Sequence, residues 1–161
     1  MWTVIDSPIG ELRLVERAGA ITAIEFSPFT DATTDGRPRG ARQDDHPLLL
    51  EAGRQLAAYF ARDLKEFDLP LAPGGSAFQQ QVWTQLQVIG YGETATYGEV
   101  AHRIGRTNAA SRAVGLANGS NPIPVVIPCH RVIGANGTLT GYAGGLERKQ
   151  LLLSLEQNAL F

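Results

Sequence analysis

The chain has 161 residues, of which 43% are hydrophobic and 19% are charged, and its formal net charge is −2. This length allows one domain or two small ones, and the composition excludes an intrinsically disordered chain. The single cysteine excludes an intrachain disulfide bond and a zinc site built from several thiolates.

The sequence carries no sign of a membrane segment or a secretory signal. No apolar run approaches the roughly 18 residues that predict a transmembrane helix, and no basic segment followed by an apolar one opens the chain. We therefore expect a cytoplasmic protein without membrane contact. Residues 1–75 carry 8 Lys/Arg against 12 Asp/Glu, whereas residues 76–161 carry 6 against 4. This mild basic excess permits a nucleic-acid-binding face in the second half without requiring one.

The first half of the chain predicts a small antiparallel sheet. Short segments rich in β-branched or apolar residues, separated by turn residues, span 2–6, 12–16 and 20–26. The polar stretch 27–45, with scattered Gly and Pro, predicts a surface loop.

A helix is expected to follow this loop. Apolar residues recur at helical spacing from Leu49 to Phe60, Pro47 suits the first turn, and Asp45 is the expected cap. Residues 66–75 then predict a short strand and a linker, where we place a domain boundary.

The second half predicts mainly helices. Capping-box patterns, in which Ser or Thr precedes Gln or Glu by three residues, pair Ser76 with Gln79 and Thr96 with Glu99. A third helix is expected to run from a cap at Thr107 or Asn108 through Ala117. Together with the helix that begins after Thr96, it forms a helix-turn-helix pattern.

These elements predict an α+β protein with two domains. A small N-terminal antiparallel β-sheet domain with one helix, 1–75, precedes a mostly helical C-terminal domain that contains the helix-turn-helix, 76–161. We expect the N-terminal domain to support the C-terminal one.

The only cysteine, Cys129, is the first candidate for chemistry. A free cysteine is most often a buried and inert small hydrophobe. Here the polar pair His130-Arg131 follows it within an apolar run that three prolines break. A nucleophilic cysteine needs a base or a positive environment, because a thiol is only a few per cent ionised at neutral pH. Since neighbours in a strand point to opposite faces, a relay from Cys129 to His130 requires a turn or a bridging water.

The Gly-rich segment 134–145 predicts a hairpin, and a helix that ends near Glu156 is expected after it. Such a loop is either a plain turn or a place where backbone approaches a ligand closely. It is not a phosphate-binding loop, because the G-K-[ST] pattern is absent.

The run Pro128-Cys129-His130-Arg131-Val132 resembles the active-site signature of the O6-alkylguanine-DNA alkyltransferases, also called methylated-DNA–protein-cysteine methyltransferases. The similarity covers the whole C-terminal half and continues in order and spacing through 112–115, 121–122, 141–145 and 148–156. The N-terminal segment fits the family's less constrained domain.

The resemblance implies direct DNA repair. A methyl or small alkyl group would pass irreversibly from O6 of guanine, or O4 of thymine, in duplex DNA to Cys129, with one turnover per chain. His130 would take the thiol proton through a water, and Glu156 would orient His130. Tyr97 would donate a hydrogen bond to the base as negative charge develops on the guanine. No cofactor and no metal ion are implied.

The resemblance also implies a DNA-binding surface on the second helix of the pair. This helix would enter the minor groove, and Arg112 would take the place of the flipped nucleotide. Ser111, Ala113 and Gly115 are small enough for close approach to the groove, although small residues also suit helix packing. Asn121 would be the hinge between this helix and the active-site segment.

The base pocket is implied around the cysteine. Main chain near Cys129, Val132 and Ala143 would hold the base edge, and Tyr142 would form a wall. The partner implied is double-stranded DNA that contains O6-alkylguanine, bound by a monomer or by chains assembled cooperatively on DNA. The chain departs from the family in a helix-turn-helix turn that is about one residue longer and has Thr107 where a Pro is common.

Two other function classes remain as alternatives. Alkyltransferase-like proteins bind the flipped base but lack the nucleophilic cysteine, so Cys129 argues against a damage sensor. A cysteine-dependent acyl-transfer hydrolase would need an oxyanion hole, and only the Cys129-His130 adjacency supports it. A zinc-dependent base deaminase is excluded because it needs a C-x-x-C pair.

Overall fold

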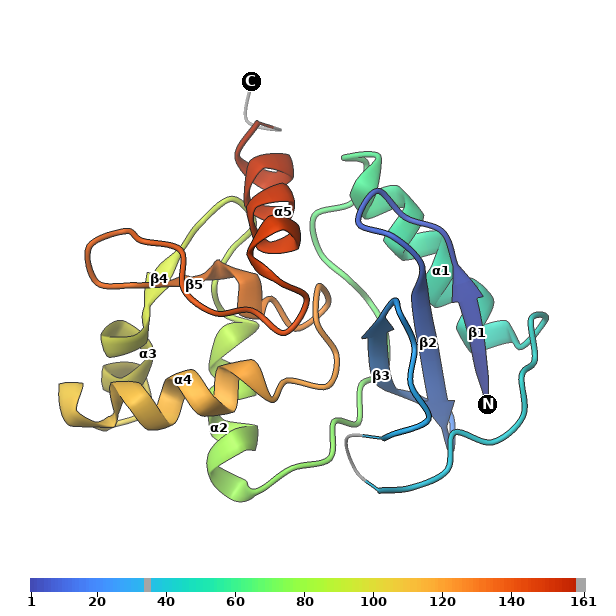
Figure 1. The fold of residues 1–161 in the computed structure, drawn as a ribbon, viewed down its shortest axis with the longest axis horizontal. Helices are drawn as coiled ribbons and strands as arrows, with labels where there is room; N and C mark the ends of the chain where they lie inside the picture. The colour runs from blue at the N-terminus through green and yellow to red at the C-terminus, as the bar shows by residue number, and fades with distance from the viewer. Residues whose placement is uncertain (34–35, 159–161) are drawn as a thin grey trace. The chain divides into compact units, whose positions relative to one another are not determined.

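The computed structural model describes residues 1–33 and 36–158. The chain divides into two compact units, Met1–Gly74 and Gly75–Phe161 (Figure 1). The first contains an antiparallel sheet with one helix, and the second is mainly helical, so the predicted α+β architecture is confirmed. No helix within the described ranges combines the length and apolar character that crossing a bilayer requires.

The sheet of the first unit has the order β1-β2-β3. Its antiparallel strands are β1 (Trp2–Ile5), β2 (Leu12–Arg17) and β3 (Ala20–Phe26). Both outer strands also gain a parallel bridge from a loop, Trp2 to Arg42 and Ile21 to Leu71. The short strand expected in 66–75 is therefore a single bridging residue, and the two loops cover backbone groups that an edge strand would expose.

Helix α1 (Pro47–Phe60) packs against β1 and β2 and buries Leu49, Leu56 and Tyr59. The expected cap at Asp45 is wrong. Because Pro47 occupies the first turn, the capping position falls on His46, whose Nδ1 accepts a hydrogen bond from the Leu48 amide at 3.2 Å.

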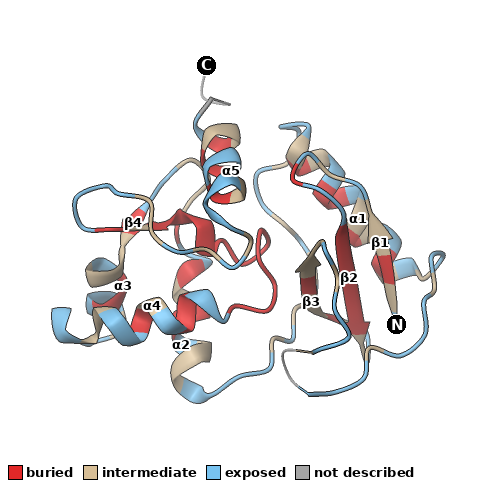
Figure 2. Cartoon of the chain, viewed as in Figure 1, coloured by how far each residue is buried: buried red, intermediate tan, exposed pale blue. Residues whose placement is uncertain are grey.

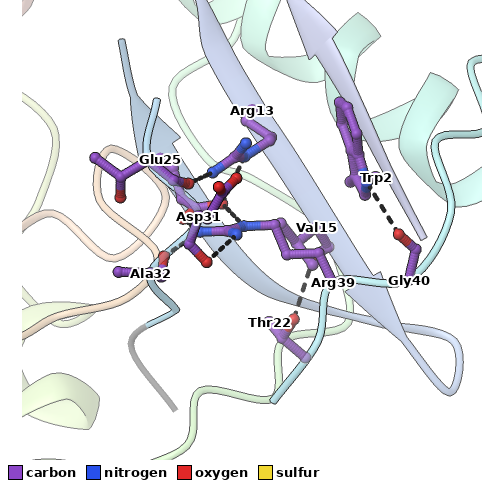
Figure 3. A network of polar contacts seen from close by, with 10 residues as sticks. Trp2, Arg13, Val15, Thr22, Glu25, Asp31, Ala32, Arg39 and Gly40 are labelled. Atoms are coloured by element: carbon purple, nitrogen blue, oxygen red, sulfur yellow. Dashed lines mark hydrogen bonds and ion pairs between the residues drawn. The ribbon is translucent and has the colours of Figure 1, made fainter. Parts of the chain in front are cut away.

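A polar network fastens the loop after β3 to the sheet (Figure 3). The Glu25 carboxylate accepts hydrogen bonds from Arg13 Nε at 2.9 Å and Arg39 Nε at 2.7 Å. The same guanidiniums donate to loop carbonyls, Arg13 to Thr30 at 2.8 Å and Arg39 to Asp31 at 3.1 Å. Burial opposes ionisation of Glu25, but the two arginines outweigh it and lower the pKa of this carboxyl. The loop predicted from its polar composition thus has an ordered attachment to β2 and β3.

The second unit contains four α-helices within its described residues, 75–158. They are α2 (Ala77–Leu86), α3 (Tyr97–Arg103), α4 (Ser111–Gly119) and α5 (Leu146–Asn158). Both predicted capping boxes are confirmed, at the starts of α2 and α3. The buried Trp83 of α2 donates from Nε1 to the Ala117 carbonyl of α4 at 2.8 Å, which joins the two helices.

Helices α3 and α4 form the predicted helix-turn-helix, but the turn differs from expectation. A short 3₁₀ turn, η1 (Asn108–Ala110), precedes α4, and Thr107 makes no capping hydrogen bond. The Asn108 side chain instead lies 3.0 Å from Nε2 of His102 on α3. Neither predicted cap therefore serves α4, because a 3₁₀ turn that includes Asn108 comes before the helix.

A two-stranded parallel sheet, β4 (Ala95–Thr96) with β5 (Val132–Ile133), joins distant segments of this unit. The hairpin predicted for 134–145 is wrong: Gly134 donates to Thr138 at 2.9 Å in a turn, while β5 pairs with β4. Every residue from 121 to 132 is buried, so this stretch forms the centre of the unit's core (Figure 2).

Candidate functional site around Cys129

Cys129 opens a 3₁₀ turn, η2 (Cys129–Arg131), directly after Pro128. This turn removes the alternation of a strand, which was the objection to cooperation between Cys129 and His130. The residue is only 4% exposed. Burial raises the pKa of its thiol to about 11, although side-chain hydrogen bonds with Asn121 and Tyr142 and the charge of Lys149 act in the opposite direction. The resting cysteine is therefore protonated at neutral pH.

Asn121 and Asn118 shape the segment that leads to the cysteine. Asn121 accepts from the Ile123 amide at 3.0 Å and donates from Nδ2 to the Ile127 carbonyl at 2.7 Å. Asn118 donates to the Cys129 carbonyl at 3.3 Å. Between Ile123 and Ile127, the two residues that Asn121 binds, Val125 adopts a φ of 73°, which a β-branched residue rarely does. Nothing in the position of Asn118 in the sequence indicated its contact with Cys129.

His130 and Glu156 meet in the interior of the unit. His130 Nε2 lies 2.6 Å from Glu156 Oε2, and both side chains are at most 1% exposed. Burial lowers the pKa of His130 although the carboxylate opposes this shift, so the ring is neutral at neutral pH. Its Nδ1 is buried and has no hydrogen-bond partner among the described residues.

Arg131 shares the Glu156 carboxylate with His130. Its Nε lies 2.9 Å from Oε1 and its Nη2 lies 3.1 Å from Oε2, while Nη1 donates to the Ile89 carbonyl at 2.6 Å. Burial would raise the pKa of Glu156, but the hydrogen bonds and charges of His130 and Arg131 hold it at about 2. The sequence marked Arg131 as a polar interruption of an apolar run but assigned it no role.

Glu156 lies on the buried face of helix α5, and this face carries a second charged residue. Lys149, Leu152, Leu153 and Glu156 recur at helical spacing and are all buried. Leucines of this face were visible in the sequence, so the same spacing could have identified Lys149 as buried. Its Nζ donates to the Val132 carbonyl at 2.6 Å.

The remaining predicted pocket residues differ in how far they are buried. Val132 is buried in β5, Tyr142 is half-buried and lowers the pKa of the Cys129 thiol, and Ala143 is exposed. Tyr97 is the first residue of α3, and its hydroxyl lies 2.5 Å from Thr140 Oγ1 in the Gly-rich loop.

The predicted DNA-contacting residues lie together on α4. Arg112 and Ala113 are exposed, and Ser111 and Gly115 are half-buried. A Cβ at Gly115 would lie 3.6 Å from Tyr97 Cε1, so this small residue brings α4 close to that ring. No hydrogen bond or ion pair of the described residues joins Arg112 to Cys129.

An open groove of about 780 Å³ follows the helix-turn-helix. Its lining includes two of the predicted site residues, Tyr97 and Ser111, together with His102, Arg103 and Asn108. Within the described ranges, no group of three or more His, Cys, Asp or Glu side chains is arranged to hold a metal ion.

Family models match almost the entire chain. The 6-O-methylguanine DNA methyltransferase DNA binding domain matches residues 77–158, and the ribonuclease-like domain of the same family matches residues 1–73. Methylated-DNA–protein-cysteine methyltransferases from Mycolicibacterium paratuberculosis and Methanosarcina acetivorans are 51% and 49% identical to this chain. The alignments cover 97% and 96% of this chain, and 92% and 97% of the two relatives.

Solved structures agree with these sequence relationships. The crystal structure of Mycobacterium tuberculosis OGT in complex with DNA matches with a TM-score of 0.85 and 46% identity. The match covers 98% of this chain and 93% of that one. The chain therefore belongs to the 6-O-methylguanine DNA methyltransferase family, and its activity is direct DNA repair by transfer of an alkyl group to a cysteine.

Proposed function

We propose that Cys129 is the cysteine that accepts the alkyl group. The buried hydrogen bond between His130 and Glu156, adjacent to the chain's single cysteine, is the observation that supports this assignment. His130 takes the thiol proton through a bridging water, because its neutral ring leaves Nδ1 as an acceptor when Nε2 faces the carboxylate. Glu156 stabilises the imidazolium that forms.

The transfer is an in-line displacement at the alkyl carbon. A bond forms between the Cys129 sulfur and this carbon while the bond from the carbon to O6 breaks. The electron pair of the broken bond goes to the guanine, which regains a proton. Tyr97 donates a hydrogen bond to the base as this charge develops, which requires its hydroxyl to leave or share its contact with Thr140.

The product limits the protein to one turnover. A thioester can be hydrolysed because it has an acyl carbon and a thiolate leaving group, whereas a thioether has neither property in water. No described residue offers a route to remove the alkyl group, so each chain accepts one methyl or small alkyl group.

The substrate is the damaged nucleotide within duplex DNA, flipped out through the minor groove. Arg112 fills the space that the nucleotide leaves, and Ser111, Ala113 and Gly115 allow α4 to approach the groove. Asn121 connects this helix to the cysteine. Val132, Tyr142 and Ala143 enclose the base. O4-alkylthymine is a second substrate of the same chemistry.

We further infer that a single chain carries out the repair in the cytoplasm, and that the N-terminal domain supports the C-terminal one. Cooperative assembly on DNA is the alternative to a monomer. Sedimentation of the protein with duplexes of increasing length distinguishes these two modes, because assembly gives several chains per duplex at partial saturation.

Intact-protein mass spectrometry tests the acceptor. The protein is mixed with a duplex that carries one O6-methylguanine, and Cys129→Ser is the matched control. We expect an increase of one methyl mass, saturating at one per chain, mapped to Cys129 and absent in the variant. Binding without a mass increase would indicate a damage sensor. Repeated turnover with a thioester substrate would indicate a hydrolase.

A further inference from the structure

Lys149 is a buried cation beside the candidate site. Its side chain is 0% exposed, and its Nζ donates to the carbonyls of Val132 at 2.6 Å and Thr140 at 3.1 Å. Among the described residues, no carboxylate forms an ion pair with it. Burial of an ammonium group without a counter-charge is unfavourable, so its retention requires a compensating interaction.

The other charged groups near Cys129 compensate one another. Arg131 is paired with Glu156 through two hydrogen bonds, and His130 is neutral. Lys149 is therefore the buried positive charge of this cluster that no described anion balances. Lys149 Nζ lies 2.6 Å from the carbonyl of Val132, the residue that directly follows the Cys129–Arg131 turn, and its charge favours ionisation of the Cys129 thiol by lowering its pKa.

We propose that Lys149 is a positioning residue for alkyl transfer, whose buried ammonium stabilises the Cys129 thiolate. The proposal depends on the assignment of Cys129 as the acceptor. The carbonyls of Val132 and Thr140 fix the ammonium in place from two sides, on β5 and on the Gly-rich loop. When Cys129 loses its proton to the water-bridged His130, the thiolate and Lys149 form a neutral pair.

Burial raises the pKa of the Cys129 thiol and so disfavours the reactive thiolate. The Lys149 ammonium acts against this effect and makes the thiolate more accessible. Asn121 and Tyr142 can donate hydrogen bonds to the sulfur, but neither carries a positive charge. A nearby opposite charge in a buried site favours the ionised form of a group by about tenfold to a thousandfold. Once the thioether has formed, the sulfur is neutral and this stabilisation ends.

Three substitutions separate the charge from the hydrogen bonds. Lys149→Gln keeps a donor without charge, Lys149→Met removes both, and Lys149→Arg keeps both. Lys65→Gln is the matched control, because Lys65 is exposed and lies in the other unit. Each variant is compared with the unmodified protein by its thermal unfolding midpoint before its kinetics are measured.

Two reactions of Cys129 are then followed by intact mass. One is transfer from a saturating O6-methylguanine duplex, and the other is methylation by methyl iodide without DNA, which does not use the base pocket. We expect Lys149→Gln and Lys149→Met to slow both reactions by at least about tenfold, Lys149→Arg to recover much of the loss, and Lys65→Gln to change neither. The dissociation constant of the duplex, measured with Cys129→Ser in each background, should change by less than twofold.

A double-mutant cycle provides a readout that does not depend on activity. Cys129→Asp places at the cysteine position a carboxyl group, which ionises far more readily than the thiol. We expect Lys149→Gln to lower the unfolding midpoint by several degrees more in the Cys129→Asp background than in the unmodified protein, because the lysine then loses a counter-charge. This comparison remains informative where a single variant is less stable.

Two results would overturn the proposal. One is an unchanged methyl iodide rate in Lys149→Gln together with slower transfer from duplex, which would limit Lys149 to shaping the base pocket. The other is no coupling between the two substitutions in the thermal cycle. Failure of the Cys129 assignment is distinguishable, because the unmodified protein would then gain no methyl group from the duplex at Cys129.

Discussion

His130 Nε2 lies 2.6 Å from Glu156 Oε2, although the two residues are 26 positions apart in the chain. The carboxylate selects the tautomer with the proton on Nε2, which leaves Nδ1 as the acceptor of the ring. Arg131 binds the same carboxylate and keeps it ionised. The imidazole is thereby prepared to receive a proton before DNA arrives.

Replacing Glu156 by Gln should impair both transfer and folding. The amide cannot balance the buried charge of Arg131, so the free energy of unfolding should fall by about 3–5 kcal/mol. Transfer from O6-methylguanine duplex at saturation should slow by about 100-fold or more, because His130 loses the group that orients it. Single-turnover mass spectrometry and urea denaturation measure the two effects. Glu147→Gln on the exposed first turn of α5 is the control, and equal behaviour of the two variants would contradict the role of Glu156.

The stability of the protein should fall in two stages as the pH decreases. The folded-state pKa of His130 is lowered, so protonation of the unfolded state destabilises the fold as the pH falls below about 6.5. The pKa of Glu156 is held at about 2 against 4.5, so its contribution, about 3 kcal/mol, is present above pH 4.5 and lost as the pH falls towards 2. Urea denaturation from pH 7 to pH 3 measures this dependence. Glu156→Gln should show a smaller lower stage, because the lowered pKa of Glu25 also contributes to it, and an unchanged lower stage in that variant would assign it to other carboxyls.

Asn121 should prove sensitive even to an isosteric change. Asn121→Ala leaves the buried Ile123 amide without its partner, which costs about 1–3 kcal/mol, and removes one of two donors to the Ile127 carbonyl, which still accepts from the Cys129 amide at 2.8 Å. Asn121→Asp keeps the acceptor for Ile123 but places a negative charge beside Cys129, which raises the pKa of the thiol further. We expect Asn121→Asp to slow methylation of Cys129 by methyl iodide more than Asn121→Ala does. The opposite order would show that the hinge geometry, not charge at the sulfur, limits the reaction.

Arg112 should matter for duplex DNA and much less for single strands. Arg112→Ala removes the side chain proposed to fill the space of the flipped nucleotide, so transfer from an O6-methylguanine duplex should slow by about tenfold or more. A single-stranded oligonucleotide needs no extrusion from a base-paired stack, and its transfer rate should change by only a fewfold. Stability should be unaffected because Arg112 is exposed.

Arg112→Lys is the charge-matched control for this prediction. It keeps the positive charge near the DNA backbone but lacks the planar guanidinium, so it should bind duplex nearly normally and still transfer slowly. An equal loss on duplex and on single strand in Arg112→Ala would contradict a role in extrusion.

Local hydrogen bonding explains which elements were predictable. The capping boxes at Ser76 and Thr96 join residues three apart, so their spacing in the sequence is their geometry. The three N-terminal strands were likewise predicted by short segments rich in β-branched or apolar residues with turns between them. The cap of α4 failed because a longer turn can form a 3₁₀ turn of its own, and composition does not distinguish the two outcomes.

The sequence by itself determined the family, the position of the single cysteine and the polar pair that follows it, because these are properties of residue type and spacing. Only the tertiary structure decided that Arg131 shares the Glu156 carboxylate, that β5 pairs with β4, and that Lys149 is buried against the Val132 carbonyl. These contacts join residues far apart in the chain. Their formation depends on how helices and loops fill one core, which local spacing does not encode.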